Sequence, residues 1–235
     1  MIHCLHGAVG SFRDWNTLAR SFPKEINAID LWRFFDQGKP TLIEAGEMIA
    51  ARAKQNDVLL GYSMGGRLAL HALLEAPSKW KAAIIVSAHP GLTEQRDERL
   101  LADQEWADLC RRNWQTFLRK WNSQGILGTL PSGLHQAAEQ DQGPVAGSFQ
   151  SWSLGAQEDL RPRLAKLNLP VLWLTGEADS RFTDLAHEVV PLIPGAKHQI
   201  IAESGHRVPW EQPDLFGAEV ENFLATMRRY TSIRL

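Results

Sequence analysis

The sequence predicts an α/β fold in which a mostly parallel β-sheet is flanked by helices and carries a helical cap. Three observations predict it. Short apolar segments alternate with segments of helical periodicity along most of the 235 residues. The alternation stops between residues 88 and 169, where about eighty mostly helical residues intervene, far more than a connection between strands requires. The run Gly61-Tyr62-Ser63-Met64-Gly65 joins a strand directly to a helix.

The predicted strands are short apolar runs bounded by turn-forming residues. In chain order they span residues 2–5, 26–30, 58–62, 82–88, 171–175 and 198–202. The predicted helices have apolar residues at three- and four-residue spacing and follow capping or helix-starting residues. They span residues 14–22, with Asp14 as N-cap, and residues 42–54, 64–75, 184–190 and 213–228.

Breaking residues separate these elements and mark the domain organisation. They are Pro77, Gly91, Pro170, Gly195 and Pro213. The strands on either side of the long helical interruption fit one sheet, so the sequence predicts a core of residues 1–88 and 170–235 and a cap insertion of residues 89–169. Ligands of parallel α/β sheets bind at the carboxyl ends of the strands, and we expect the cap to cover that edge.

The composition is ordinary for a soluble globular protein and argues against several kinds of partner. A formal net charge of −2 gives no basis for binding nucleic acid or an anionic membrane. Cys4 and Cys110 are too few for a disulfide framework and lack metal-ligand spacing, so we expect free thiols in a reducing compartment. The sequence shows neither a signal-peptide pattern nor an apolar run of transmembrane length. We expect a cytoplasmic monomer or small homo-oligomer.

Ser63 stands at the centre of a G-x-S-x-G run between a predicted strand and a predicted helix, a setting typical of a nucleophile elbow. A serine on so sharp a turn has a strained backbone. Glycine at positions 61 and 65 avoids side chains that would collide with the neighbouring backbone. The turn lifts the hydroxyl clear of the sheet, beside a helix N-terminus that favours an anion. Ser63 is therefore the predicted reactive hydroxyl.

A serine hydroxyl needs an imidazole to accept its proton and a carboxylate to orient that imidazole. Asp179 follows the predicted strand 171–175, and His206 follows the predicted strand 198–202. The three residues come in the order serine, acid, histidine, which is the order in α/β-hydrolase folds, and each follows a strand end at the same edge of the sheet. The sequence predicts Ser63, Asp179 and His206 as a catalytic triad.

Other residues compete for two of these roles. Glu177 and Asp184 are alternative acids, although Glu177 lies nearer the strand end and Asp184 is typical of a helix cap. His187 falls within a helix and His198 within a strand, which favours packing or surface roles for both. The remaining histidines precede the acid in the sequence and are expected to be structural or to line the substrate pocket.

Two backbone N–H groups are predicted to form an oxyanion hole, that of Ala8 in the glycine-rich loop after the first strand and that of Met64. A simple strand-exit turn is the alternative at Ala8. Arg67 lies one helical turn beyond Ser63 on the same face. A guanidinium there suits an anionic substrate because it binds carboxylates through two hydrogen bonds, and a structural ion pair is the alternative.

Several segments resemble one branch of the α/β-hydrolase superfamily. They are Gly61-Tyr62-Ser63-Met64-Gly65-Gly66-Arg67, His89-Pro90-Gly91-Leu92, Gln95-Arg96-Asp97-Glu98-Arg99, Leu160-Arg161-Pro162-Arg163-Leu164 and Gly176-Glu177-Ala178-Asp179-Ser180-Arg181-Phe182, with Trp106 and Trp121. This likeness covers nearly the whole chain. It is to the 2-succinyl-6-hydroxy-2,4-cyclohexadiene-1-carboxylate (SHCHC) synthases of menaquinone biosynthesis. Those enzymes eliminate pyruvate from an enolpyruvyl-bearing cyclohexene dicarboxylate.

The resemblance implies a lyase without cofactor or metal that acts on a small carboxylate substrate. By matching position, Ser63, Asp179 and His206 would start the elimination by abstracting a proton. Arg67 and Arg99 would hold the substrate carboxylates.

Trp121 would line the cap side of the pocket, and we expect it alone among the cap tryptophans to do so. The others are Trp106, Trp114 and Trp152. Tyr62, next to the serine, is also expected to bind substrate.

The sequence departs from that family in three places. The family usually has a further cap arginine in the segment that aligns with residues 134–143, and this segment contains none. Asp30 is followed by residues 31–36 in place of the common D-x-P-G-x-G turn, and Arg33 is a candidate source of the missing charge. The chain also begins directly in a strand, which predicts an N-terminally trimmed version of the fold.

Three functions follow from these observations. The first is the lyase. The second is a serine hydrolase, a carboxylesterase or thioesterase, that acts on a small anionic acyl substrate through an acyl-Ser63 intermediate. The third is a catalytically silent receptor, which predicts an eroded triad. Because lyase and hydrolase would use the same triad, the arginines distinguish them, and two or more converging over Ser63 would favour the lyase.

Overall fold

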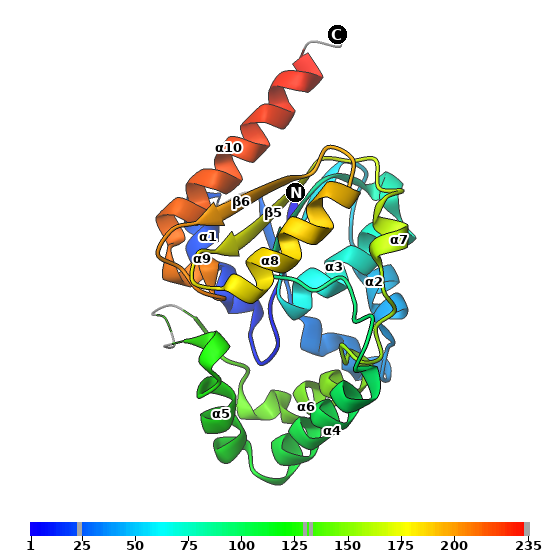
Figure 1. Ribbon diagram of the computed structural model, residues 1–235, viewed down its shortest axis with the longest axis vertical. Helices are drawn as coiled ribbons and strands as arrows, with labels where there is room; N and C mark the ends of the chain where they lie inside the picture. The colour runs from blue at the N-terminus through cyan, green and yellow to red at the C-terminus, as the bar shows by residue number, and fades with distance from the viewer. Residues whose placement is uncertain (23–24, 129–130, 132–133, 233–235) are drawn as a thin grey trace.

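The computed structural model describes residues 1–22, 25–128, 131 and 134–232, and its strands form a single sheet (Figure 1). The sheet is parallel, with strand order β2-β1-β3-β4-β5-β6. The strands are β1 Ile2–Leu5, β2 Ile26–Ile29, β3 Asp57–Tyr62, β4 Trp80–Val86, β5 Val171–Gly176 and β6 Lys197–Ile201. All six predicted strands are confirmed, with ends displaced by at most about two residues, the usual uncertainty of element ends.

Helices cover both faces of the sheet, as predicted (Figure 1). One face carries α2 Leu42–Ala50, α3 Met64–Glu75 and α8 Ser180–Val189, and the other carries α1 Asn16–Ser21, α9 Val208–Glu211 and α10 Pro213–Ser232. Successive residues of β3 point to opposite faces. Leu59 joins the apolar cluster under α2 and α3, while Val58 and Leu60 join the cluster under α10. The central strand β3 is therefore apolar on both sides, as a doubly covered parallel sheet requires.

Two predicted helix caps are wrong. Asp14 does not begin a helix, because Ser11 caps the 3₁₀ helix η1 Phe12–Trp15, and Asp14 is its third residue, whose carboxylate accepts the N–H of Ser11 at 3.0 Å. Asp184 lies inside α8, which starts earlier than predicted because Asp179 occupies its N-cap position. Both errors arise because serine and aspartate are cap-forming residues that occur close together in these segments.

The interruption between β4 and β5 is helical, as predicted. It contains α4 Arg96–Arg112, α5 Trp114–Asn122, α6 Gln142–Ser151 and the short α7 Arg161–Leu164. In Figure 1, α4, α5 and α6 (green) form a separate layer below the sheet. Aromatic rings hold this layer together, with the rings of Trp106 and Trp121 5.4 Å apart. Since one apolar cluster runs from α2 and α3 into α4–α6, the division at residues 88 and 170 stays a prediction.

The two ends of the cap segment meet. The N–H of Leu160 donates to the carbonyl of Pro90 at 2.8 Å, and the guanidinium of Arg161 donates to the carbonyl of Gly91 at 3.0 Å. Gly91 has a φ of +119°, and a side chain there would collide with the carbonyl of Glu158. The close approach of the two ends of the cap segment therefore requires glycine at this position. Within the described ranges, no helix has the length and apolarity needed to cross a membrane.

Candidate active site

Ser63 lies on a strained turn between β3 and α3, with φ +52° and ψ −112°. The two flanking glycines have no room for a side chain. A Cβ at Gly61 would lie 2.5 Å from the carbonyl oxygen of Gly65, and one at Gly65 would lie 2.5 Å from that of Leu5. The local sequence therefore permits a turn that presents the Ser63 hydroxyl at the carboxyl edge of the sheet.

The structure brings together Ser63, His206 and Asp179 from the ends of β3, β6 and β5. Nε2 of His206 lies 3.1 Å from Oγ of Ser63, and Nδ1 of His206 lies 2.7 Å from Oδ2 of Asp179. A carboxylate only accepts, so Nδ1 carries the proton and Nε2 is free to accept the serine proton. His206 and Asp179 are 4% and 5% exposed, which shields this relay from water.

The alternative acids and bases lie elsewhere. Glu177 is exposed, and its carboxylate accepts the N–H of Glu203 at 3.0 Å. His198 is hydrogen bonded to Oγ1 of Thr175 at 2.8 Å and packs its ring against that of His187 at 5.0 Å. Both histidines have the packing roles that their positions in β6 and α8 suggested.

The loop after β1 is held in a fixed orientation beside Ser63. Nε2 of His6 accepts the N–H of Leu31 at 3.2 Å, so Nδ1 is the protonated nitrogen, and it donates to the carbonyl of Gly7 at 2.9 Å. Complete burial lowers the pKa of His6 to about 4, which keeps the ring neutral. Because a peptide group is planar, fixing the Gly7 carbonyl also fixes the N–H of Ala8. Ala8 and Met64 both line the cavity next to Ser63.

A cavity of about 190 Å³ opens above Ser63, between the sheet edge and the cap. Three arginines line it, Arg67 from α3, Arg99 from α4 and Arg181 from α8. Among the described lining residues, Asp103 is the one carboxylate apart from the triad. The cavity therefore has an excess of positive charge and suits an anionic ligand.

Arg67 is buried and bound to uncharged acceptors. It donates to Oε1 of Gln157 at 2.9 Å and to the carbonyl of Trp152 at 2.6 Å. Burial, followed by the nearby charge of Arg99, lowers the pKa of Arg67 to about 10, so it stays charged at neutral pH. Within the described part of the chain, Arg67 forms no ion pair, and the ion-pair alternative is wrong. Its guanidinium is thus held by neutral groups rather than by a carboxylate in direct contact.

Arg99 is partly neutralised. Its Nε lies 2.9 Å from Oδ2 of Asp103, which also accepts the hydroxyl of Ser153 at 2.7 Å. Arg99 and Asp103 both line the cavity. The structure thus brings Arg67 and Arg99 into one cavity, from a core helix and a cap helix.

Arg33 does not supply the missing cap charge. It pairs with Asp30 and Asp36 at 3.4 and 4.0 Å, its side chain is 58% exposed, and it is not among the described residues that line the cavity. The third arginine that lines the cavity is Arg181, for which the sequence predicted no role.

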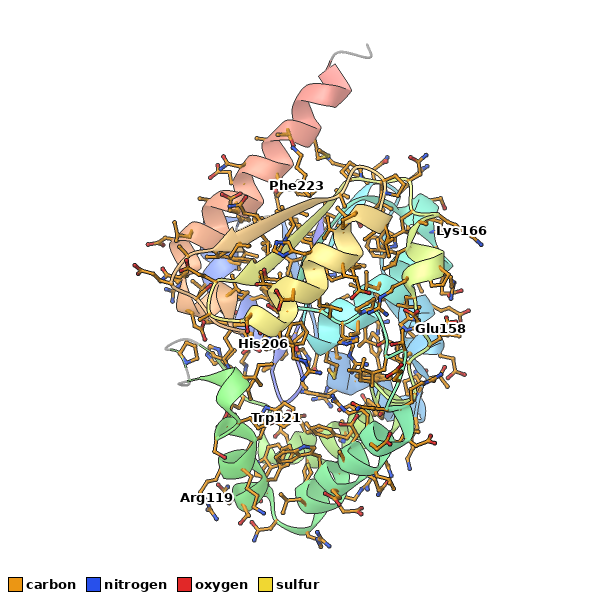
Figure 2. The ribbon with its side chains drawn as sticks, viewed as in Figure 1. Arg119, Trp121, Glu158, Lys166, His206 and Phe223 are labelled. Carbon is orange, nitrogen blue, oxygen red and sulfur yellow. The ribbon has the colours of Figure 1, made fainter. Side chains whose placement is uncertain are left out.

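More cap tryptophans line the cavity than the one that was expected. Trp121 lines the cavity, and Figure 2 shows it on the cap below His206. Trp152, expected only to pack the cap, lines the cavity as well and also donates from its indole N–H to the carbonyl of Pro40 at 2.9 Å. Its place depends on contacts with distant segments, which sequence spacing does not reveal.

Tyr62 lines a second, smaller cavity of about 30 Å³ that shares Ser63, Ala8 and Trp121 with the first. Its ring packs against the rings of His206 and Trp210, at 5.6 and 4.8 Å. Tyr62 therefore borders this neighbouring space and is not among the described residues that line the main cavity.

A buried arginine, Arg207, also lines this second cavity. It donates to Oδ1 of Asn122 at 3.1 Å.

Ser87 and His89, which follow β4, line the cavity as well. His89 is one of the histidines expected to be structural or to line the pocket, whereas Ser87 was not predicted. The motif His89-Pro90-Gly91-Leu92 was a usable signal for His89, whereas Ser87 carries no sequence signal. In the described ranges, no three His, Cys, Asp or Glu side chains are grouped closely enough to hold a metal ion.

Comparison with known proteins agrees with this geometry. Residues 4–219 match the alpha/beta hydrolase family. The chain is 31% identical over 238 residues to the 2-succinyl-6-hydroxy-2,4-cyclohexadiene-1-carboxylate synthase of Serratia proteamaculans, covering 94% of this chain and 91% of that protein. MenH from S. aureus has a similar fold, with a TM-score of 0.81, 24% identity and coverage of 97% and 94%. So has a malate-bound thermophilic esterase from Thermogutta terrifontis, with a TM-score of 0.71, 17% identity and coverage of 96% and 89%.

Proposed function

This chain belongs to the alpha/beta hydrolase family and, within it, to the SHCHC synthases, and from that premise we propose that it is a carbon–oxygen lyase that eliminates pyruvate. The substrate would be an enolpyruvyl-bearing cyclohexene dicarboxylate, and the product would be the compound for which those relatives are named. The single observation that carries the proposal is the convergence of Arg67, Arg99 and Arg181 on the cavity above Ser63.

The triad would act as a base. His206, oriented by Asp179, accepts the proton of the Ser63 hydroxyl, and the serine oxygen removes a proton from the substrate carbon next to the acyl carbonyl. The electron pair of the broken C–H bond moves toward the carbonyl oxygen. Hydrogen bonds from the N–H groups of Ala8 and Met64 stabilise the negative charge that develops there.

Elimination follows when that charge returns to the ring. The electron pair shifts through the ring and breaks the carbon–oxygen bond to the enolpyruvyl group, which leaves as the enolate of pyruvate and takes up a proton. No acyl–serine bond forms in this sequence. Arg67 and Arg99 would hold the two carboxylates, so that the reacting C–H bond faces Ser63.

The charge of the cavity favours the lyase over a carboxylesterase or thioesterase. Ester hydrolysis through an acyl-Ser63 intermediate would use the same triad but would not require several arginines around the acyl group. The fold of the malate-bound esterase shows only that this architecture also occurs in a hydrolase.

The deciding experiment is incubation with the enolpyruvyl dicarboxylate and assay of pyruvate. We expect release far above the spontaneous rate, and loss of at least about a hundredfold in kcat/KM for Arg67→Met, because a charge-assisted carboxylate contact is removed. Hydrolysis of p-nitrophenyl esters, unaffected by Arg67→Met and without pyruvate release, would overturn the lyase and favour the hydrolase.

We also propose a cytoplasmic location and a monomer or small homo-oligomer. The two buried free cysteines support a reducing compartment. Size-exclusion chromatography with light scattering measures the oligomeric state.

A further inference from the structure

Ser87 has a buried hydroxyl group that lacks a partner. The residue follows β4, is 0% exposed and lines the cavity above Ser63. Its backbone N–H donates to the carbonyl of Leu174 at 2.9 Å, but its Oγ makes no hydrogen bond to the described residues. Buried hydroxyl groups are almost always paired, so an unpaired one beside a cavity points to a ligand.

His89, two residues further on, presents a donor to the same cavity. Its Nδ1 accepts the N–H of Gly91 at 3.1 Å, so the ring proton is on Nε2. Burial, followed by the charge of Arg161, lowers the pKa of His89 to about 3, and the ring is neutral at any physiological pH. Nε2–H is thus an uncharged donor in a cavity whose other strong donors are arginines.

The positions of these two groups are fixed relative to Arg67. Nε2 of Gln157 donates to the carbonyl of His89 at 3.1 Å, and Oε1 of the same amide accepts from Arg67 at 2.9 Å. Two consecutive peptide steps separate Ser87 from His89, so their Cα atoms are at most about 7 Å apart. Both polar atoms can therefore meet the same small group of a ligand.

We propose that Ser87 and His89 form a neutral subsite that binds the ring hydroxyl group of the substrate. This inference rests on the proposed function, whose product carries two carboxylates, one ketone and one hydroxyl. A hydroxyl group needs one donor and one acceptor. His89 Nε2–H can only donate, and Ser87 Oγ can accept, so together they match a hydroxyl and leave the carboxylates to the arginines.

A pair of ligands tests the subsite. The product has the hydroxyl, whereas 2-succinylbenzoate, the aromatic compound left when water is removed from it, keeps both carboxylates and the ketone. Binding of each is measured by calorimetry with wild type, Ser87→Ala and His89→Asn. Asparagine can still accept the N–H of Gly91 through Oδ1, but it does not extend as far as Nε2.

The matched control is Ser148→Ala. Ser148 also lines the cavity, but its hydroxyl already donates to the carbonyl of Val145 at 2.7 Å. We expect wild type and this control to bind the product about tenfold more tightly than 2-succinylbenzoate, a preference of the size of one neutral hydrogen bond. Ser87→Ala and His89→Asn should each reduce the ratio to about two or less, while their affinity for 2-succinylbenzoate is unchanged.

Retention of the tenfold ratio in both variants, or equal binding of the two ligands by wild type, would overturn the subsite. Pyruvate release is measured separately on the wild type. A wild type that releases pyruvate but shows no preference refutes the subsite alone, whereas one that releases none refutes the proposed function.

Discussion

Arg207 and Asn122 are joined by a hydrogen bond of 3.1 Å across the boundary between core and cap. Arg207 follows His206 in the chain, and Asn122 follows Trp121 at the end of α5. Oδ1 of Asn122 also accepts from Nε2 of Gln136 at 3.0 Å. The bond thus connects the loop that carries His206 to the helix that carries Trp121, on the other side of the cavity.

Removing this connection should weaken substrate binding. We expect Asn122→Ala to lower kcat/KM about tenfold, mainly through KM, because a hydrogen bond to a charged group that positions the cap is lost. Steady-state pyruvate release measures the effect. Asn113→Ala, which removes the N-cap bond to the N–H of Thr116 at the other end of α5, is the control for general loosening of the helix. Equal effects of the two variants would contradict the prediction.

Strain at Ser63 predicts a stability difference between two inactive variants. Ser63→Ala and Ser63→Gly both lack the hydroxyl, but only glycine adopts a φ of +52° without strain. We expect the free energy of unfolding to be about 1 kcal/mol higher for Ser63→Gly than for Ser63→Ala. This difference already allows for the greater entropy of the unfolded chain with glycine, which opposes it. Urea denaturation measures it, and an alanine variant of equal or greater stability would show that the turn is not strained.

His71 predicts how stability depends on pH. It is 1% exposed, neither ring nitrogen has a partner among the described residues, and burial, followed by the charge of Arg67, lowers its pKa to about 4. The unfolded chain takes up a proton near pH 6.5 and the folded chain does not. Proton uptake by the unfolded chain therefore lowers the free energy of unfolding as the pH falls from 6.5 toward 4, by up to about 1.4 kcal/mol per pH unit.

We expect His71→Leu to flatten this slope and to raise the free energy of unfolding, since leucine leaves no unpaired polar atoms. Urea denaturation at several pH values between 4 and 7 provides the measurement. An unchanged slope in His71→Leu would assign the acid sensitivity to other buried groups, such as His6.

Asp103 offsets part of the positive charge of the cavity. Asp103→Asn keeps an oxygen that can accept the Ser153 hydroxyl but removes the negative charge beside Arg99. We expect dicarboxylate ligands to bind several-fold more tightly, with a steeper loss of affinity as salt is added. Calorimetry at two salt concentrations measures both effects. Weaker binding would mean that Asp103 serves chiefly to orient the Arg99 side chain.

Local sequence patterns were sufficient to predict the strands of the sheet and the three residues that meet at its edge. Strand ends of a parallel sheet meet at one edge, so residues that follow β3, β5 and β6 were expected to converge, and Ser63, Asp179 and His206 do. The helix caps were less predictable, because Ser11 and Asp14 are both cap-forming residues and only the backbone geometry distinguishes them.

The partners of buried side chains could not be predicted from spacing. Arg67 is held by Trp152 and Gln157, which are 85 and 90 residues away in the chain, so the choice between an ion pair and a ligand site required the fold. The same holds for Arg33, whose exposed pairing with Asp30 and Asp36 excludes it from the cavity. Only the structure distinguishes Ser87 from other serines, because it shows that the hydroxyl is buried without a partner among the described residues.

The crossing at Pro90 and Leu160 has a consequence for how the cap segment tolerates changes of length. Because the chain leaves and re-enters the sheet through positions that are hydrogen bonded to each other, residues 91–159 behave as an insertion with closed ends. The free energy of closing such a loop rises by only about 0.6 kcal/mol for each doubling of its length. A change of length in this segment should therefore cost little stability and leave the sheet edge that carries Ser63 in place.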